Sequence, residues 1–339
     1  MTKAILLRNL LFASLAIVLA ATVPVAAQLD GAFTLRASDS GDRVNLNLQY
    51  GDNGRSNYGR TFERSALTDV ARSGDRVTFT LRRPAGSFAF DGRGTMERAA
   101  GSYRFSPSAE FRGQIERLGF KDVDDKALFV FAMDNLSIAD VKQLQGLVSD
   151  ALDTPQLVRL INHGAGVRYV QAMTDAGFRK LESDEYRRAR DHGVSAEFVS
   201  EMTALGVKVP LAELVRLRDH GVSADYVRQM RAAGLDVSHE ELVRAKDHGV
   251  SADFVRRMGA LGFQGLPLSD YVRMRDHGVT ADFIEAVRAA GLKPTATEAV
   301  RLRDHGVSAD YIRRVKEQFK TTPTVEEIIR LRSRGELPK

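Results

Sequence analysis

A His-Gly pair recurs six times between residues 163 and 306, and it constrains the fold more than any other feature of the chain. Successive histidines are separated by 29, 28, 28, 29 and 28 residues: His163, His192, His220, His248, His277 and His305. A period of roughly 20–50 residues is typical of stacked arrays, in which each unit buries its apolar side against its neighbours. The sequence therefore predicts an α-solenoid with a long surface, rather than an enzyme built around a closed pocket.

Each copy of the motif has the pattern of a corner between two short helices. The glycine after the histidine fits the left-handed position just past a helix end: Gly193, Gly221, Gly249, Gly278 and Gly306. In the best copy, Ser223 stands where an N-cap oxygen is needed, Asp225 lies in the next first turn, and Gly234 closes the second helix. We therefore expect helix-pair repeats of 28–29 residues, with the histidines and glycines in structural positions.

Degenerate copies extend the array at both ends, as capping repeats do. Residues 108–120 match residues 223–235 in pattern, and Asn135 lies 28 residues before His163. At the other end, residues 325–335 repeat a first helix, with Arg334 in the histidine position. We expect an α-solenoid of about seven helix-pair repeats over residues 108–339, preceded by a β domain over residues 28–107.

The β domain is indicated by an alternation of period two. The clearest runs are residues 33–36, 44–48, 76–81, 88–90 and 103–105, with weaker runs at 60–63 and 95–97. Turn residues separate the runs at 39–42, 51–54, 73–75, 84–86 and 91–92. The pattern predicts a small antiparallel β-meander, a half-barrel or a sandwich, that leans on the first helices of the array.

Two interpretations of the β domain remain open at the level of sequence. Its apolar set is no larger than an ordinary core requires, which favours a packed cap. The alternative is a small-molecule binder of the lipocalin sort. Tyr58 and Arg60 are candidates for a recognition edge in this domain.

An aromatic residue stands six positions after each histidine, and an arginine stands four positions before it. The aromatic residues, which at helical spacing predict a core stripe, are Tyr169, Phe198, Tyr226, Phe254, Phe283 and Tyr311. The arginines are Arg159, Arg188, Arg216, Arg244, Arg273 and Arg301, with Arg330 in the closing half unit. Three residues before each arginine stand Gln156, Glu185, Glu213, Glu241, Asp270, Glu298 and Glu327.

The arginine row has two interpretations. An acid and an arginine at i and i+3 share one helix surface, so the rows fit solvated ion pairs worth about 0.2–0.5 kcal/mol each. Alternatively, the arginines face a partner, because their planar guanidinium groups suit carboxylates and backbone carbonyls. On this second hypothesis the partner-binding candidates are Arg188, Arg216, Arg244, Arg273, Arg301, Glu213 and Glu241.

A second basic row stands two positions before the histidine: Arg190, Arg218, Lys246, Arg275 and Arg303. By helical angle it falls between apolar positions, so its side chains must extend to solvent or be paired. Acids five positions after the histidine are available in the same repeats: Glu197, Asp225, Asp253, Asp282 and Asp310. We predict ion pairs between these two rows, such as Arg218 with Asp225.

The histidines do not form a metal site on geometric grounds. Equivalent atoms of stacked helix pairs lie about 10 Å apart, whereas zinc ligands must lie about 2.0–2.1 Å from one ion. A histidine at a helix C-terminus is the commoner situation. The chain has no cysteine, no glycine-rich phosphate loop and no Gly-x-Ser-x-Gly elbow. We expect no metal, no cofactor and no catalytic residue.

Residues 1–27 have the pattern of a secretory signal. Lys3 and Arg8 precede an apolar run, and small residues follow Pro24 where a peptidase would cleave; an uncleaved membrane anchor is the alternative. After Ser108 the chain has 35 basic and 35 acidic residues, so charge gives no reason to expect nucleic acid. These features predict a periplasmic or secreted protein that meets a membrane only through the signal segment.

The unit Arg-Asp-His-Gly-Val-Ser-Ala-Asp-Tyr, as in residues 218–226, resembles helix-pair repeats of bacterial secreted proteins. It is similar to repeats that follow the peptidase part of antirepressor-type, beta-lactam-sensor-like membrane zinc metallopeptidases. The resemblance covers residues 108–335. Because the chain has neither a zinc-peptidase motif nor a multi-span membrane part, the resemblance implies an extracytoplasmic interaction or sensing role and no protease activity.

Together these observations favour a non-enzymatic extracytoplasmic scaffold that binds a protein or peptide on the solenoid surface. The alternative is a small-ligand sensor, with the ligand in the β domain and the array as scaffold or transmitter. An enzyme of a type without a known motif is the third class.

Overall fold

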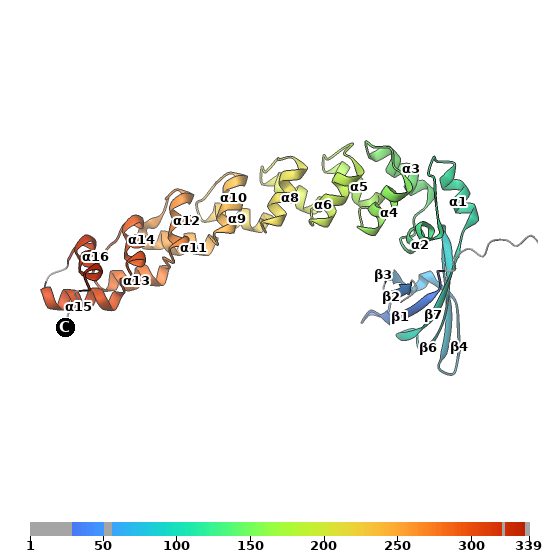
Figure 1. Ribbon diagram of the computed structural model, residues 1–339, viewed down its shortest axis with the longest axis horizontal. Coiled ribbons are helices and arrows are strands. Elements are labelled where there is room, and N and C mark those ends of the chain that lie inside the picture. The colour runs from blue at the N-terminus through green and yellow to red at the C-terminus, as the bar shows by residue number, and fades with distance from the viewer. Residues whose placement is uncertain (1–28, 51–55, 321–322, 336–339) are drawn as a thin grey trace, which may run out of the picture. The chain divides into compact units, whose positions relative to one another are not determined.

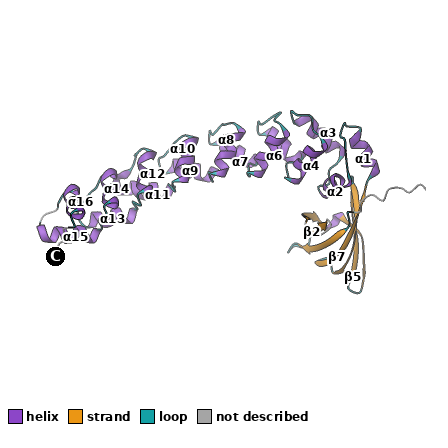
Figure 2. Cartoon of the chain, viewed as in Figure 1, coloured by secondary structure: helices purple, strands orange, loops and turns teal. Residues whose placement is uncertain are grey.

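The computed structural model describes residues 29–50, 56–320 and 323–335, in two compact units (Figure 1). The first unit holds the described residues up to Arg117 together with Asp122–Ser137, and the second holds Leu118–Lys121 and the chain from Ile138 onward. An antiparallel sheet followed by helical repeats was predicted, and this architecture is confirmed (Figure 2). The predicted signal segment and the predicted turn at 51–54 lie outside the described residues.

The first unit is built on one sheet of seven antiparallel strands. These are β1 (Gly31–Ala37), β2 (Arg43–Tyr50), β3 (Ser56–Glu63), β4 (Leu67–Ser73), β5 (Arg76–Arg83), β6 (Gly86–Gly94) and β7 (Arg98–Pro107), and a short 3₁₀ turn η1 (Arg64–Ala66) joins β3 to β4. The strand order is β3-β2-β1-β7-β6-β5-β4. This is the order of an up-and-down barrel that stays open between β3 and β4.

The predicted strands and turns of this sheet need three corrections. β4 was not predicted, because only Leu67 of its seven residues is buried and its apolar residues do not alternate. Residues 95–97 form the turn between β6 and β7, where the Arg98 N–H donates to Thr95 O at 3.2 Å. The predicted turn at 91–92 lies inside β6. Glycine at position 92 allows Phe33 and the backbone of Ala100 to pack closely against β6, because a Cβ on this residue would lie 2.8 Å from Phe33 Cζ and 2.5 Å from Ala100 O.

Aromatic rings fill the dry face of the sheet, and a helix covers it. Phe33, Phe79 and Phe90 meet with ring centroids 4.5–5.5 Å apart. Two helices follow β7 in this unit, α1 (Ala109–Glu116) and α2 (Asp125–Met133), and α2 packs on β6 and β7. Phe129 of α2 meets five rings of the sheet: Tyr50, Tyr58, Phe88, Tyr103 and Phe105. The prediction that the sheet leans on the next helices is thus confirmed for α2.

The second unit consists of helix pairs in two layers. The first-helix layer contains α4 (Thr154–Asn162), α6 (Ser183–Asp191), α8 (Leu211–Asp219), α10 (His239–Asp247), α12 (Leu268–Asp276), α14 (Ala296–Asp304) and α16 (Val325–Ser333). The second-helix layer contains α3 (Ile138–Leu147), α5 (Val167–Asp175), α7 (Ala196–Ala204), α9 (Ala224–Ala232), α11 (Ala252–Met258) with a π-type turn η2 (Gly259–Phe263), α13 (Ala281–Ala289) and α15 (Ala309–Phe319). Helices of one layer contact the next helix of the same layer, as in α12 with α14 and α13 with α15. The repeats therefore stack in series (Figure 1).

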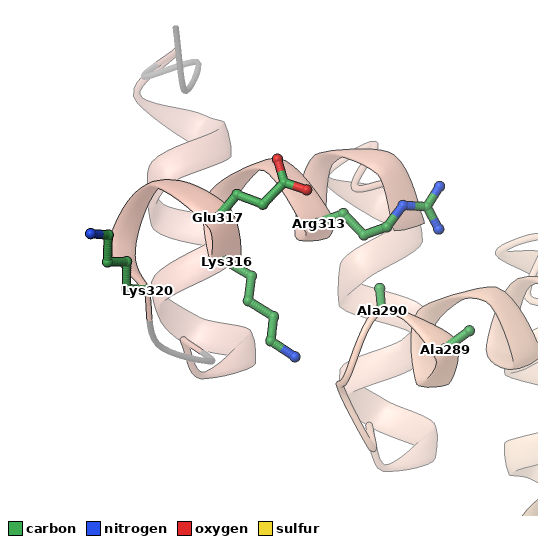
Figure 3. Close-up of a pocket in the computed structure, with 6 residues that line it drawn as sticks. All are labelled: Ala289, Ala290, Arg313, Lys316, Glu317 and Lys320. Carbon is green, nitrogen blue, oxygen red and sulfur yellow. The ribbon is translucent and has the colours of Figure 1, made fainter.

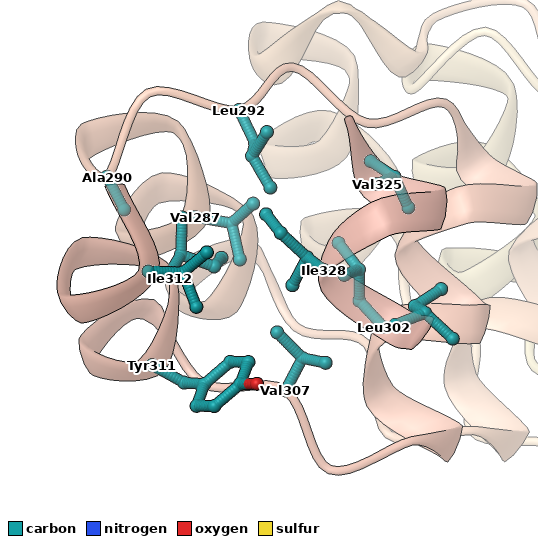
Figure 4. Packing of buried hydrophobic residues seen from close by; sticks show 11 residues of the cluster. Val287, Ala290, Leu292, Leu302, Val307, Tyr311, Ile312, Val325 and Ile328 are labelled. Atoms are coloured by element: carbon teal, nitrogen blue, oxygen red, sulfur yellow. The ribbon is translucent and has the colours of Figure 1, made fainter. Parts of the chain in front are cut away.

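The core of the array is shared between consecutive repeats. Figure 4 shows the last segment of this core, in which Val287 of α13, Ile312 of α15 and Ile328 of α16 point toward one another. Of the predicted aromatic stripe, Phe198, Tyr226, Phe254 and Tyr311 are buried, while Tyr169 and Phe283 are half-buried. The stripe is thus confirmed as core, with two half-buried members.

The leading degenerate copy is shifted by one residue from the expected alignment. Helix α2 ends with Asp134 as its C-cap, and Asn135 follows with φ 56°. Helix α4 ends with His163 as its C-cap, and Gly164 follows with φ 69°. Asn135 therefore occupies the glycine position, and Asp134 occupies the histidine position, 29 residues before His163. Asparagine tolerates the left-handed conformation better than most residues, which explains the substitution.

Candidate functional site

Every corner of the array closes with the same backbone motif. The histidine is the C-cap of the first helix, and the glycines after it have φ between 62° and 72°: Gly164, Gly193, Gly221, Gly249, Gly278 and Gly306. In α6, Gly193 N–H donates to Arg190 O at 3.0 Å and Val194 N–H donates to Ala189 O at 2.9 Å. These two bonds define a Schellman motif, which requires a left-handed residue and favours glycine. The predicted structural role of these glycines is confirmed.

A serine or threonine begins the second helix two residues after the glycine. The Ser223 hydroxyl accepts from Tyr226 N–H at 3.1 Å, and Ser195, Ser251, Thr280 and Ser308 cap their helices in the same way. The first copy has Gly166 at this position without a side-chain cap. The corner sequence thus satisfies both helix ends locally, which leaves the side chains at the corner free to bind neighbouring repeats.

The histidine side chain bonds to the following repeat. Its Nδ1 lies 2.6–2.8 Å from an aspartate Oδ1 in five successive pairs: His163–Asp191, His192–Asp219, His220–Asp247, His248–Asp276 and His277–Asp304. His305 has Ser333 Oγ at 3.2 Å instead. The five histidine side chains are between 37% and 43% exposed. We call this row of contacts between consecutive repeats the seam.

The second basic row also belongs to the seam, and the predicted ion pairs with acids of the same repeat are wrong. Each cation lies over an aromatic ring of the preceding repeat, 4.7–5.4 Å from the ring centroid: Arg190 over Tyr169, Arg218 over Phe198, Lys246 over Tyr226, Arg275 over Phe254, Arg303 over Phe283 and Arg332 over Tyr311. The same cation lies against the corner glycine, since a Cβ on Gly193 would be 3.3 Å from Arg218 Nη2. A cation on a ring face contributes about 0.5–1 kcal/mol at an exposed site.

The acids five positions after the histidine have other partners. Asp225, Asp253 and Asp310 pair with the arginine three residues further along the same helix: Arg228, Arg256 and Arg313. Asp282 pairs with Arg257 of the preceding repeat. Glu197 has a lowered pKa, because its own backbone N–H and the Ser195 hydroxyl donate to its carboxylate, and the charge of its predicted partner Arg190 makes a smaller contribution without an ion pair. The predicted partners are thus separated because the ring of the previous repeat holds the cation.

Most side chains three residues before the arginine row serve as helix caps. Five of these side chains accept a hydrogen bond from the N-cap backbone N–H at 2.7–3.0 Å: Gln156, Glu185, Glu241, Glu298 and Glu327. Two helices, α8 and α12, begin after Pro210 and Pro267, and proline has no N–H to donate. There the acid pairs with its own arginine, at 3.4 Å for Glu213–Arg216 and 3.7 Å for Asp270–Arg273. Among the described residues, the predicted i,i+3 ion pair is therefore confirmed in these two repeats only.

The arginine row lies on the exposed surface of the first-helix layer. Arg188, Arg216 and Arg244 are exposed, and Arg273 and Arg301 are half-buried. Arg301 pairs with Glu326 of the next repeat, and Arg273 Nη2 donates to Thr297 Oγ1 at 2.6 Å. The row therefore contributes to the surface of this layer.

A shallow hollow of about 410 Å³ lies at the far end of the second-helix layer (Figure 3). It is lined by Ala289, Ala290, Arg313, Lys316, Glu317 and Lys320. Lys316 reaches the C-terminal end of α13, where a Cβ on Gly291 would be 2.8 Å from its Nζ. In the same position of earlier repeats, Arg231 donates to Leu205 O at 2.6 Å and Arg288 lies over Phe263. A cation at a helix C-terminus stabilises the helix, so Lys316 continues a packing motif.

The recognition edge expected at Tyr58 and Arg60 is tied into the first unit. Arg60 Nη2 donates to Tyr58 Oη at 3.2 Å, its guanidinium lies 4.9 Å from the Tyr58 ring, and its Nε lies 3.5 Å from Asp134. Burial raises the pKa of Tyr58 to about 12. The two side chains connect β3 to the end of α2, and this contact gives them a structural role.

Within the described residues, no group of three or more His, Cys, Asp or Glu side chains is arranged to hold a metal ion. Across the same part of the chain, no helix is long and apolar enough to cross a membrane. Comparison with protein-family models, with curated proteins and with solved structures finds no match to this chain. The assignment of function therefore depends on the geometry of the array.

The aspartates of the seam were missed in the sequence, although a signal for them exists. An aspartate precedes the histidine in each repeat that follows a histidine-bearing repeat: Asp191, Asp219, Asp247, Asp276 and Asp304. The first histidine-bearing copy follows a repeat without histidine, and it has Asn162 in this position. The sequence comparison matched equivalent positions of the repeats. Comparison of the residue types in each repeat with those in the repeat before it would have indicated the pairing of aspartate with histidine.

Proposed function

We propose that this protein is a non-enzymatic extracytoplasmic scaffold that binds a protein or peptide along the first-helix layer of its array. The observation that carries the proposal is that the charged rows differ in their contacts with neighbouring repeats. The histidines and the second basic row are engaged between repeats, whereas Arg188, Arg216 and Arg244 of the arginine row are exposed and make no hydrogen bond or ion pair to another repeat among the described residues. Stacked repeats offer long binding surfaces, and exposed charged rows on such surfaces determine partner choice and association rate.

The location rests on residues 1–27, whose pattern is that of a secretory signal. The resemblance of the repeats to those of bacterial secreted proteins agrees with a periplasmic or secreted protein with an interaction role. The small-ligand alternative has weaker support, because the rings of Phe33, Phe79 and Phe90, with Phe129 of α2, fill the dry face of the sheet.

The proposal is tested by site-specific photo-cross-linking in the native envelope. A photo-reactive residue at Ala212 probes the first-helix layer, and one at Gln229 probes the second-helix layer; both positions are exposed. We expect a defined protein or peptide adduct from Ala212 and a much weaker one from Gln229. Reversal of Arg216, Arg244 and Arg273 to Glu should lower the adduct yield about tenfold, because three charge contacts become repulsive. An unchanged yield from the triple variant would show that the arginine row does not bind the partner.

A further inference from the structure

The partner of each arginine in the row is set by one position in the next repeat, the second residue of its first helix. Arg301 pairs with Glu326 at this position, and Arg273 donates to Thr297 at 2.6 Å. Asp184 has a lowered pKa, chiefly from the hydrogen bond of Arg187, with a smaller contribution from the charge of Arg159 in the preceding repeat.

Glu240 is the second residue of α10 and so occupies the same position there. Its pKa is lowered first by its own backbone N–H and by Ser238, and then by the charges of His239 and Arg216. Arg273 and Arg301 thus bond to a side chain of the next repeat, and the charges of Arg159 and Arg216 act on a carboxylate there.

Helices α8 and α12 differ. Their second residues are Ala212 and Ser269; neither supplies a carboxylate, and among the described residues neither bonds to Arg188 or Arg244 of the preceding repeats. The acids of those preceding repeats, Glu185 and Glu241, are engaged as caps by backbone N–H groups at 3.0 Å. Within the described part of the chain, Arg188 and Arg244 are thus exposed guanidinium groups without an ion pair.

The two arginines have equivalent places two repeats apart. Helices of one layer pack about 10 Å apart, so the two guanidinium groups are separated by about 20 Å along the layer. An extended peptide rises about 3.3 Å per residue, so about six residues span this distance. Arg216 lies between them, with its own Glu213 at 3.4 Å, and it adds no unpaired charge.

We infer that Arg188 and Arg244 form a two-point carboxylate site for an extended acidic segment of the partner, with its two acidic side chains about six residues apart. This inference rests on the proposed function and assigns the chemistry of the partner. Arginine suits the role because its fork of N–H donors matches a carboxylate in two parallel hydrogen bonds.

The inference is tested with peptide rulers on the full chain. Polyproline is a stiff helix that rises about 3.1 Å per residue, so fluorescent peptides with two glutamates separated by two, five or eight prolines present defined spans. At low ionic strength we expect the five-proline ruler to bind about fivefold more tightly than the other two rulers and than a version with one Glu replaced by Gln, as measured by fluorescence anisotropy.

Two double variants should remove this preference by opposite routes. Arg188→Gln with Arg244→Gln deletes the guanidinium groups. Ala212→Glu with Ser269→Glu keeps them and gives each an internal carboxylate, in the way that Glu326 engages Arg301. The matched control is Thr297→Glu, which changes only the neighbour of Arg273 and should leave ruler binding within about twofold of the original protein. Equal binding of all rulers, or unchanged binding by both double variants, overturns the inference.

The same variants separate this inference from the proposed function. If Arg188→Gln with Arg244→Gln still gives the adduct from the probe at Ala212 in the envelope, the two-point site is wrong while the scaffold function stands. If the original protein gives no adduct but binds the five-proline ruler selectively, the site stands and the proposed cellular function is wrong.

Discussion

The two units of this protein achieve stability in different ways. In the first unit the sheet joins residues that are far apart in the chain, such as Leu35 of β1 with Ala99 of β7, and one side chain, Phe129, meets five rings. In the array every bond of the seam reaches only the adjacent repeat, as in His192 with Asp219. Stability is therefore concentrated in a few residues of the first unit and distributed over many equivalent residues of the array.

The strongest test of this difference is Phe129→Ala. Phe129 is 2% exposed, and removal of a buried phenylalanine typically costs about 3–5 kcal/mol. Hydrogen exchange measured by mass spectrometry should become much faster in β6 and β7, while exchange in α8 to α14 stays unchanged. Val70→Ala, on a β4 side chain that is 49% exposed, is the control and should change stability by less than about 0.5 kcal/mol. Faster exchange across the array would contradict the separation of the two units.

A corner glycine should have the next largest effect. Gly221 has φ 70°, and a residue with a Cβ in this conformation costs about 1–2 kcal/mol. Gly221→Ala should therefore accelerate hydrogen exchange in α8 and α9. Gly146→Ala is the matched control: this glycine lies in α3, and a Cβ there would have no neighbour within 4 Å, so the variant should gain about 0.5–1 kcal/mol. Similar effects of the two substitutions would mean that the left-handed conformation is not required.

The cation–ring contacts of the seam should be smaller again and should couple neighbouring repeats. A double-mutant cycle of Arg218→Gln and Phe198→Leu is expected to give a coupling free energy of about 0.5–1 kcal/mol in denaturant unfolding. The ion pair between Arg218 and Asp225, which the structure does not contain, would predict a different result. If Arg218 paired with Asp225, then Arg218→Glu combined with Asp225→Arg would restore stability; we expect no such rescue, because Arg218 lies over Phe198 at 5.0 Å.

The smallest expected effect is a gain. His305 bonds to Ser333 at 3.2 Å, whereas the other five histidines bond to an aspartate. Ser333→Asp should therefore complete the seam and increase the free energy of unfolding by about 0.2–1 kcal/mol. In a His305→Gln background the same substitution should bring no such gain; an equal gain in both backgrounds would exclude an effect through the histidine.

The corner chemistry was predictable because it is local. A glycine after a helical stretch and a serine two residues later specify a left-handed turn and an N-cap without reference to the rest of the chain, and Gly221 and Ser223 have these roles. The stripe of aromatic residues was predictable for a similar reason, since helical spacing alone assigns it to the core. Both predictions depend on contacts within one repeat or on burial in general.

The partners of the charged rows were not predictable from one repeat. Helical angle places Arg218 near the corner but does not decide between Asp225 of its own repeat and Phe198 of the preceding one. The order of the copies contains the missing information: Ile161 and Asn162 replace the cation and the acid where the preceding repeat has no histidine. In the β domain, β4 escaped prediction because an edge strand with one buried residue needs no alternation.

The reach of the seam has a consequence for the evolution of the gene. Because the acid and the cation of one repeat meet the imidazole and the ring of the adjacent repeat only, an in-frame duplication of 28 or 29 codons would supply a new member that fits both of its neighbours. Lengthening or shortening the protein by whole copies would then need no compensating substitution elsewhere. Sister genes could accordingly differ in copy number, and each copy added would move the guanidinium groups of Arg188 and Arg244 to a new separation when it falls between them.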